Sequence, residues 1–181
     1  MTASSGYPKQ VTSRTVWNLS RHVLKQIPEF LDYSQTADLQ IRSVILSNTG
    51  RLMQSMSFAS FDYNTILTES WDESDFRNQI HSRFLFMRYQ TLGDGTIVFD
   101  GAKFWSMPAV DIEEAHAVWQ NTVNQIRSGS AHALPTIKDS PVAHVRPRAA
   151  NAADRITAPN GTLLTKKCFW LNSTYISRQL F

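Results

Sequence analysis

The sequence predicts a mixed α/β domain in which helices flank a central mixed, largely antiparallel sheet. Three observations support this prediction: strand-like runs at residues 37–46 and 83–89, apolar residues at helical spacing over residues 110–127, and no regular alternation of strand with helix. With 181 residues, 42% of them hydrophobic, the chain is long enough for one packed domain, which we place at residues 13–181. Residues 1–12 are polar and lack an apolar period, so we expect a loose arm there.

The first third of the chain is expected to form a helix followed by a hairpin. Apolar residues recur every three or four positions over residues 13–31, which favours a helix. Residues 37–46 are dense in branched side chains and end in a turn at residues 47–50, so residues 53–58 are the expected hairpin partner. Helix preference returns around residues 66–80, where acidic residues between the apolar positions are read as a solvated helix face.

The later elements follow from the same patterns. Residues 83–89 form a strong strand, and Gly93–Gly95 turns it into a second strand beginning at residues 97–99. Acidic residues open the helix predicted over residues 110–127, as the helix dipole favours. Residues 172–180 are expected to form a short helix with Asn172 as its cap.

Positive charge is concentrated near the C-terminus. The whole chain carries a formal charge of +3, whereas the residues from 141 onward hold six Lys or Arg and one acid, which gives +5 and leaves −2 for residues 1–140. Localised positive charge on a nearly neutral chain is typical of a polyanion-binding surface. Taken alone, it is equally typical of a solvated face without a partner.

A basic loop between two buried elements is predicted at residues 144–151 (HVRPRAAN). Pro147 stiffens the backbone between two arginines, and the following alanines leave space for close approach. The segment at residues 166–172 (KKCFWLN) adds a lysine pair after an Asn160–Gly161 turn. The arginines are expected on phosphate or guanine and the lysines on phosphate, while the asparagine either fixes the loop or bonds to DNA. The candidate DNA-binding residues are Arg146, Arg148, Asn151, Lys166 and Lys167.

Other site classes find little support in the sequence. The lone Cys168 excludes an internal disulfide and a Cys-based zinc site, and its apolar neighbours predict a packed thiol. The five histidines show no paired metal spacing, and no serine lies in a Gly-x-Ser-x-Gly setting. No apolar run reaches the length of a membrane span, and the N-terminus lacks the core of a signal peptide. We therefore expect a cytoplasmic protein without a membrane partner.

Several phrases of the sequence resemble one nuclease family. Residues 146–151 (RPRAAN) resemble the Arg-Pro-Lys-Ala-Ala-Asn run in the DNA-reading segment of the mismatch-repair nicking endonuclease MutH, with Arg148 in place of lysine. The closer resemblance is to the MutH-like C-terminal domain of type IIE restriction enzymes that recognise GATC. Four further phrases of that family recur here in the same order and span most of the chain: residues 54–58, 84–86, 103–108 and 165–172.

The resemblance implies a restriction-endonuclease-like fold with a Mg²⁺ site built from an Asp followed by Glu-x-Lys. Aligned on the family pattern, the Glu-x-Lys positions are Gln40 and Arg42, and Asp32 or Asp38 would be the first carboxylate. A second family glutamate is replaced by Gln54. Neutral amide oxygens are weak Mg²⁺ ligands, and arginine is a poor substitute for lysine. The catalytic set is therefore not intact, and no metal or other cofactor is expected.

Three functional hypotheses follow. The first is sequence-specific binding of double-stranded DNA, with GATC implied by the resemblance, by an effector domain that acts allosterically on a catalytic domain or subunit of the same restriction enzyme. The second is an active Mg²⁺-dependent endonuclease that uses Asp32 or Asp38 with Gln40. The third is a protein-interaction module in which the basic loop is incidental; DNA affinity that falls steeply with salt would argue against it.

Overall fold

The computed structural model describes two compact units. The first comprises described residues of Met1–Gln54 together with Arg83–Trp105, and the second comprises Ser55–Ser82 together with Ser106–Phe181. The residues described are 16, 18, 20–22, 24, 39–52, 54–148, 151 and 153–181. The predicted arm at residues 1–12 and the candidate carboxylates Asp32 and Asp38 lie outside them. The assignment of residues 13–181 to a single domain stays a prediction.

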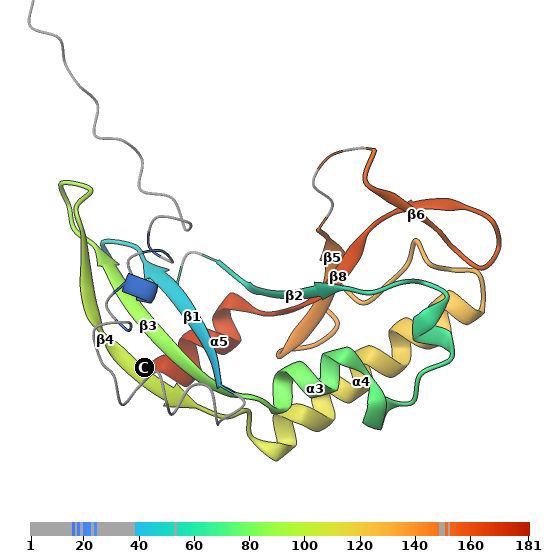
Figure 1. The fold of residues 1–181 in the computed structure, drawn as a ribbon, viewed down its shortest axis with the longest axis horizontal. Helices are drawn as coiled ribbons and strands as arrows, with labels where there is room; N and C mark the ends of the chain where they lie inside the picture. The colour runs from blue at the N-terminus through green and yellow to red at the C-terminus, as the bar shows by residue number, and fades with distance from the viewer. Residues whose placement is uncertain are drawn as a thin grey trace, which may run out of the picture. The chain divides into compact units, whose positions relative to one another are not determined.

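The first unit contains a three-stranded mixed sheet in the order β1-β3-β4 (Figure 1). Strand β1 (Leu39–Leu46) runs parallel to β3 (Arg83–Thr91), which forms an antiparallel hairpin with β4 (Ile97–Trp105). The predicted strands and the hairpin turn are confirmed, although β4 extends further than its sequence pattern indicated. Gly50 adopts the positive φ of 76° that the turn after β1 requires.

The expected hairpin between β1 and residues 53–58 is wrong. Strand β2 (Met56–Ser60) belongs to the second unit and pairs antiparallel with β8 (Lys167–Leu171). Among the described residues, an isolated bridge pairs Leu46 at the end of β1 with Leu52, just before the segment. A turn signal specifies a local reversal, but the pairing of a strand is set by the apolar face that it can bury.

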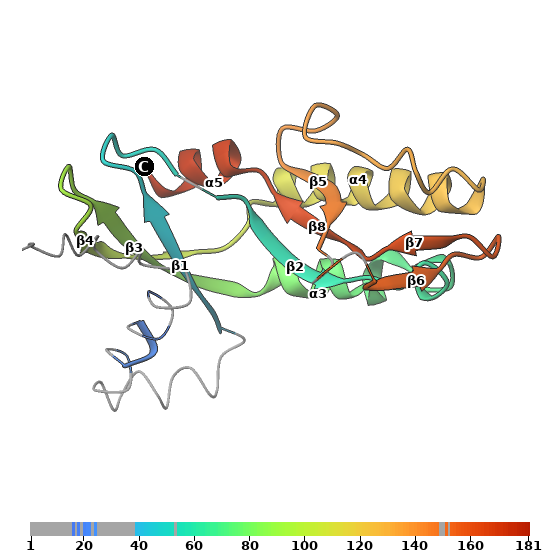
Figure 2. The same cartoon turned by 90° about the horizontal axis from the view of Figure 1, so that it is seen from above.

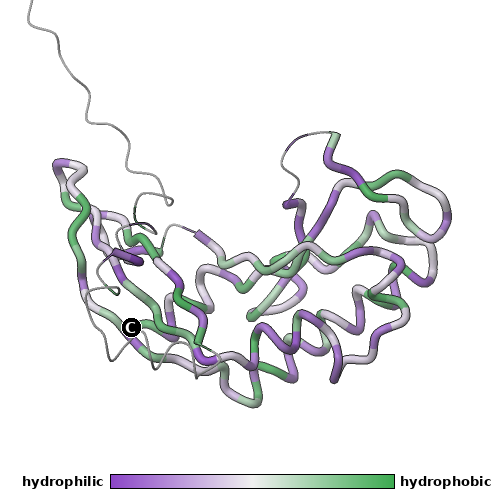
Figure 3. Tube along the Cα trace, in the orientation of Figure 1, coloured by the Kyte–Doolittle hydropathy of each residue, from purple (hydrophilic) through white to green (hydrophobic). Residues whose placement is uncertain are grey.

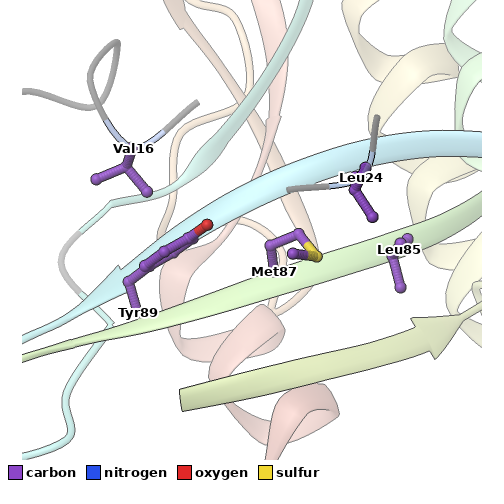
Figure 4. Packing of buried hydrophobic residues seen from close by; sticks show 5 residues of the cluster. All are labelled: Val16, Leu24, Leu85, Met87 and Tyr89. Atoms are coloured by element: carbon purple, nitrogen blue, oxygen red, sulfur yellow. The ribbon is translucent and has the colours of Figure 1, made fainter. Parts of the chain in front are cut away.

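One face of β3 forms the core of the first unit. Leu85, Met87 and Tyr89 are buried there against Val16 and Leu24 (Figure 4). The described residues between 16 and 24 are helical, in agreement with the predicted helix. A buried hydroxyl cluster ties this helix to the sheet: Ser20 Oγ lies 2.7 Å from Tyr89 Oη and 2.8 Å from Ser43 Oγ.

The second unit contains an antiparallel sheet in the order β2-β8-β5 and a separate hairpin of two short strands. Strand β5 (Ala143–Pro147) forms one edge of the sheet, while β6 (Arg155–Thr157) and β7 (Leu163–Thr165) extend beyond the end of β8 as a ribbon (Figure 2). Gly161 turns that ribbon with a φ of 81°, as predicted. In the described part of the chain, β-structure is thus divided among three small sheets instead of one central sheet.

The helices of the second unit largely match their sequence patterns. The predicted helical segment at residues 66–80 consists of two 3-10 turns, η1 (Thr65–Leu67) and η2 (Trp71–Glu73), followed by α3 (Asp75–His81). Helix α4 (Ala109–Arg127) buries one face at three- and four-residue spacing and stops before Gly129. Helix α5 (Ser173–Leu180) ends the chain. Hydrophilic and hydrophobic positions alternate along these helices (Figure 3), as expected for helices that bury one side.

An aromatic cluster joins α3 to the sheet of the second unit. The ring of Phe76 in α3 stacks on Phe169 in β8 with centroids 4.2 Å apart and meets Phe58 in β2 edge-on at 5.3 Å. All three side chains are almost completely buried. This cluster identifies which face of the sheet is covered by helix.

We expect Phe76→Ala to lower the free energy of unfolding by about 3–5 kcal/mol, because it removes a ring that contacts two strands and leaves a cavity. Denaturant unfolding monitored by circular dichroism measures the change. Ile137→Ala is the matched control, since Ile137 lies in the same unit with half of its surface exposed and should cost less than about 1 kcal/mol. Equal losses for the two variants would contradict the assignment of Phe76 to the core.

Candidate nucleic-acid interface

Strands β5 and β8 bring most of the predicted DNA-binding residues to one end of the sheet. Arg146 is opposite Cys168 in the ladder, and Pro147 is opposite Lys167. One step further, the backbone N–H of Arg148 donates to the Lys166 carbonyl over 3.0 Å. Two segments that are about twenty residues apart in sequence therefore bring four cationic residues to one end of the ladder. Because side chains alternate, Lys167 lies on the same face of β8 as Phe169.

The prediction of a loop at residues 144–151 needs correction, because residues 144–147 belong to β5. Apolar Val145 between His144 and Arg146 gives the alternation of a strand, which the prominent basic composition obscured. Pro147 is compatible with this position because β5 is an edge strand, where a missing backbone N–H is tolerated.

Helix α3 covers one face of the β5–β8 ladder and leaves the opposite face uncovered at the end that carries the cationic residues. Because side chains alternate along a strand, Phe169 packs beneath the sheet against α3 while Cys168 and Trp170 project from the opposite face. Arg146 shares that opposite face with its ladder partner. We call the surface formed by Arg146, Arg148 and Trp170 with the adjoining Lys166, above the buried Cys168, the basic face.

Arg146 lies over the indole ring of Trp170 on this face. Its guanidinium carbon is 3.7 Å from the ring centroid, which is the geometry of a cation–π contact. The Trp170 side chain is half-buried and its indole nitrogen is buried. Trp170 therefore supports an exposed arginine. Phe169, Trp105 and Trp119 are buried.

Arg148 makes a different contact from Arg146. Its Nη1 donates a 2.6 Å hydrogen bond to the carbonyl of Phe58 in β2. The β2–β8 register shifts between Ser57 and Ser60, so this carbonyl lies at an irregularity of the ladder. The Arg148 guanidinium therefore satisfies a backbone acceptor within the sheet, which makes part of its role structural.

The lysine pair also has partners within the protein. Lys166 Nζ forms a 2.7 Å ion pair with Asp154, which precedes β6. Lys167 Nζ donates to the Ala131 carbonyl over 3.2 Å, and burial lowers the pKa of its ammonium group. Each ammonium group thus has a partner within the protein, and the roles of Lys166 and Lys167 on DNA stay predictions.

Asn151 fixes the chain just after the basic face. Its Oδ1 accepts a 2.9 Å hydrogen bond from the backbone N–H of Ala153, and its carbonyl accepts from Asp154 N–H over 3.1 Å. These bonds support the loop-fixing role, one of the two roles expected from the sequence. A contact between Asn151 and DNA stays a prediction.

Cys168 is buried beneath the arginines. Burial raises the pKa of its thiol to about 11, and the positive charges of Arg148 and Arg146 offset only part of that rise. The thiol is therefore protonated near neutral pH and is a packing group, as its sequence neighbourhood predicted.

A buried polar network lies beside the basic face and was missed by sequence reasoning. Asn172 Nδ2 donates to the Ser140 carbonyl over 2.8 Å, which leaves Asn172 Oδ1 as the acceptor for His144 Nδ1 at 2.5 Å. The histidine is consequently protonated on Nδ1 in its neutral form. Asn172 occupies the N-cap position of α5 as predicted, but its side chain makes no capping hydrogen bond and bonds instead to Ser140 and His144.

The positions that the resemblance aligns with a metal site, Gln40 and Arg42, lie on β1 in the first unit and are not part of the basic face. Arg42 Nη2 donates a 2.8 Å hydrogen bond to Gln40 Oε1 on the same strand. The described residues here do not fit Mg²⁺, since the amide oxygen is neutral and is bonded to a cation. Gln54 is exposed, and no three His, Cys, Asp or Glu among the described residues gather closely enough to hold a metal.

With this geometry in hand, comparison with known proteins finds similarity to a type II restriction enzyme. The enzyme is Sau3AI from Staphylococcus aureus, which is 28% identical over 199 residues, an alignment that covers 86% of this chain and 40% of the enzyme. The chain thus spans well under half the length of that relative. No model of a protein family matches the sequence. Within the described residues, no helix is long and apolar enough to cross a membrane.

We expect the free energy of unfolding to decrease as the pH falls through about 6.5. Burial lowers the pKa of His144 below its usual value of 6.5, so the unfolded chain binds more protons than the folded chain in that range. The limiting slope for one proton is about 1.4 kcal/mol per pH unit. Urea unfolding between pH 7.5 and 5.5 measures it.

The decrease in the free energy of unfolding per pH unit should be smaller in His144→Gln than in the native protein. His132→Gln is the control, because His132 is exposed in the same unit. An undiminished slope in His144→Gln would show that other groups cause the acid sensitivity.

Proposed function

We propose that this chain binds double-stranded DNA as part of a restriction system and that the basic face is its contact surface. The observation that carries the proposal is the convergence of Arg146, Arg148 and Lys166 at one end of the β5–β8 ladder, where Lys167 adds a fourth cation on the other face of β8. Clustered guanidinium and ammonium groups provide the sequence-independent part of DNA affinity. The similarity to the type II restriction enzyme Sau3AI supports DNA as the polyanion.

We further propose that the sequence bound is GATC and that the chain acts as an effector. The RPRAAN run at residues 146–151 supports this recognition through its resemblance to the DNA-reading segment of MutH-like domains. The Gln40–Arg42 hydrogen bond supports an effector role, because it places a positive charge where the family's metal site would need anionic ligands. Cutting would then belong to another domain or subunit, and the protein would act on DNA in the cytoplasm.

The proposal predicts tighter binding to a duplex with one GATC site than to a scrambled duplex of equal length and composition. The difference should be at least about a hundredfold at physiological salt, and the logarithm of affinity should fall linearly with that of salt concentration. Fluorescence anisotropy with labelled duplexes measures both quantities.

The other hypotheses are separated by the same reaction with Mg²⁺ added. Nicking that EDTA abolishes would favour the endonuclease hypothesis over the effector role. Weak binding with a flat salt dependence would leave a protein-interaction module as the better description, and the basic face would not be a DNA surface.

Asp154→Asn is expected to strengthen DNA binding by roughly threefold and to steepen its salt dependence, since it frees Lys166 from its 2.7 Å ion pair. Glu114→Gln is the control: it makes the same change in net charge at an exposed position of α4. Equal effects of both substitutions would indicate a response to net charge only and would remove Lys166 from the contact surface.

A further inference from the structure

We infer that Trp170 is a positioning residue that holds the guanidinium of Arg146, and that Arg146, more than Arg148, supplies the base discrimination of the site. The inference rests on the proposed function, since it concerns how the basic face distinguishes one DNA sequence from another. It gives different roles to Arg146 and Arg148, although the sequence pattern does not distinguish them.

The first step is the set of contacts that each arginine makes. The guanidinium of Arg146 lies 3.7 Å from the Trp170 ring centroid, and a cation–π contact uses none of its N–H donors. Within the described part of the chain, the Arg146 side chain makes no hydrogen bond, whereas Arg148 Nη1 is committed to the Phe58 carbonyl at 2.6 Å. Bidentate recognition of guanine needs two adjacent N–H donors, which Arg146 retains.

The second step is the rigidity of the support. Trp170 lies on β8, the central strand of its sheet, opposite Ser57 of β2 on one side and His144 of β5 on the other. Its indole nitrogen is buried without a hydrogen-bond partner among the described residues, so packing and the two ladders hold the ring. A tryptophan held in this way offers a fixed ring face, so an arginine resting on it loses less conformational freedom when it binds a base.

The third step excludes the alternative that Trp170 stacks directly on a base. Arg146 already covers the ring at van der Waals distance, and direct stacking would require that contact to break. The exposed group is the guanidinium, and the ring lies beneath it. The chemistry at the DNA surface is therefore that of a planar cation with unused donors.

The test measures a discrimination ratio, defined as the affinity for a GATC duplex divided by that for a scrambled duplex at fixed salt. Trp170→Leu should lower this ratio roughly tenfold, because affinity for the GATC duplex falls more than affinity for the scrambled duplex. Trp170→Phe should keep most of the ratio, because a ring face remains. Arg146→Lys should lower the ratio as Trp170→Leu does, because lysine keeps the charge but loses the planar fork.

Trp71→Leu is the matched control. Trp71 is half-buried in the same unit and stacks on His116 with centroids 4.6 Å apart, so its loss removes a comparable ring contact away from the basic face. This variant should leave the discrimination ratio unchanged. A similar drop in both tryptophan variants would overturn the inference, as would an equal loss in Trp170→Phe and Trp170→Leu.

A readout without DNA separates this inference from the proposed function. The Arg146 side-chain protons should show an upfield ring-current shift in the NMR spectrum that disappears in Trp170→Leu. Selective DNA binding by the native protein that survives both Trp170→Leu and Arg146→Lys would overturn the inference alone. Loss of the shift in Trp170→Leu, together with no DNA selectivity in the native protein, would overturn the proposed function alone. If Trp170→Leu fails to fold, the discrimination ratio of Arg146→Lys tests the inference instead, because a substitution at the exposed Arg146 should not prevent folding.

Discussion

The pairing of β8 on both edges is the constraint on which the second unit depends. Antiparallel ladders to β2 and β5 leave the strand no freedom of register, so its side chains are divided strictly between two faces. Phe169 must point toward the Phe76 ring, and Cys168 and Trp170 must then point away from it. A shift of one residue would bury the tryptophan beneath α3 and remove the support of Arg146. The packing of the core and the position of the candidate interface therefore both depend on the register of β8.

Local patterns in the sequence predicted the elements whose signals are local. The spacing of apolar residues in α4 and the Gly-rich turn between β3 and β4 each fix a structure within about twenty residues. The partners of β1 and β2 could not be predicted in this way. Strand β1 pairs with β3 about forty residues later, and β2 pairs with β8 more than a hundred residues later. Such pairings depend on which apolar faces fit together, and composition carries little information about that.

The candidate site shows the same division between composition and geometry. Charge counting located the cations correctly at the end of the chain, but it treated them as equivalent. Their differences come from partners distant in sequence: the Phe58 carbonyl for Arg148, Ala131 for Lys167 and Asp154 for Lys166. The His144–Asn172 bond was missed for the same reason, since an asparagine before a helix is normally a cap. A pattern within one segment cannot show which distant acceptor a side chain will reach.

Internal partners also change what DNA binding would cost each cation. A phosphate that approaches Lys166 must compete with a carboxylate 2.7 Å away, and any rotation of Arg148 would leave a backbone carbonyl without its donor. Arg146 incurs neither cost, because its cation–π contact with Trp170 persists while its N–H donors bond elsewhere. An interface built in this way draws less affinity from non-specific phosphate contacts than its formal charge suggests. On the proposed function, selectivity would then depend mainly on Arg146, whose N–H donors stay available to a base.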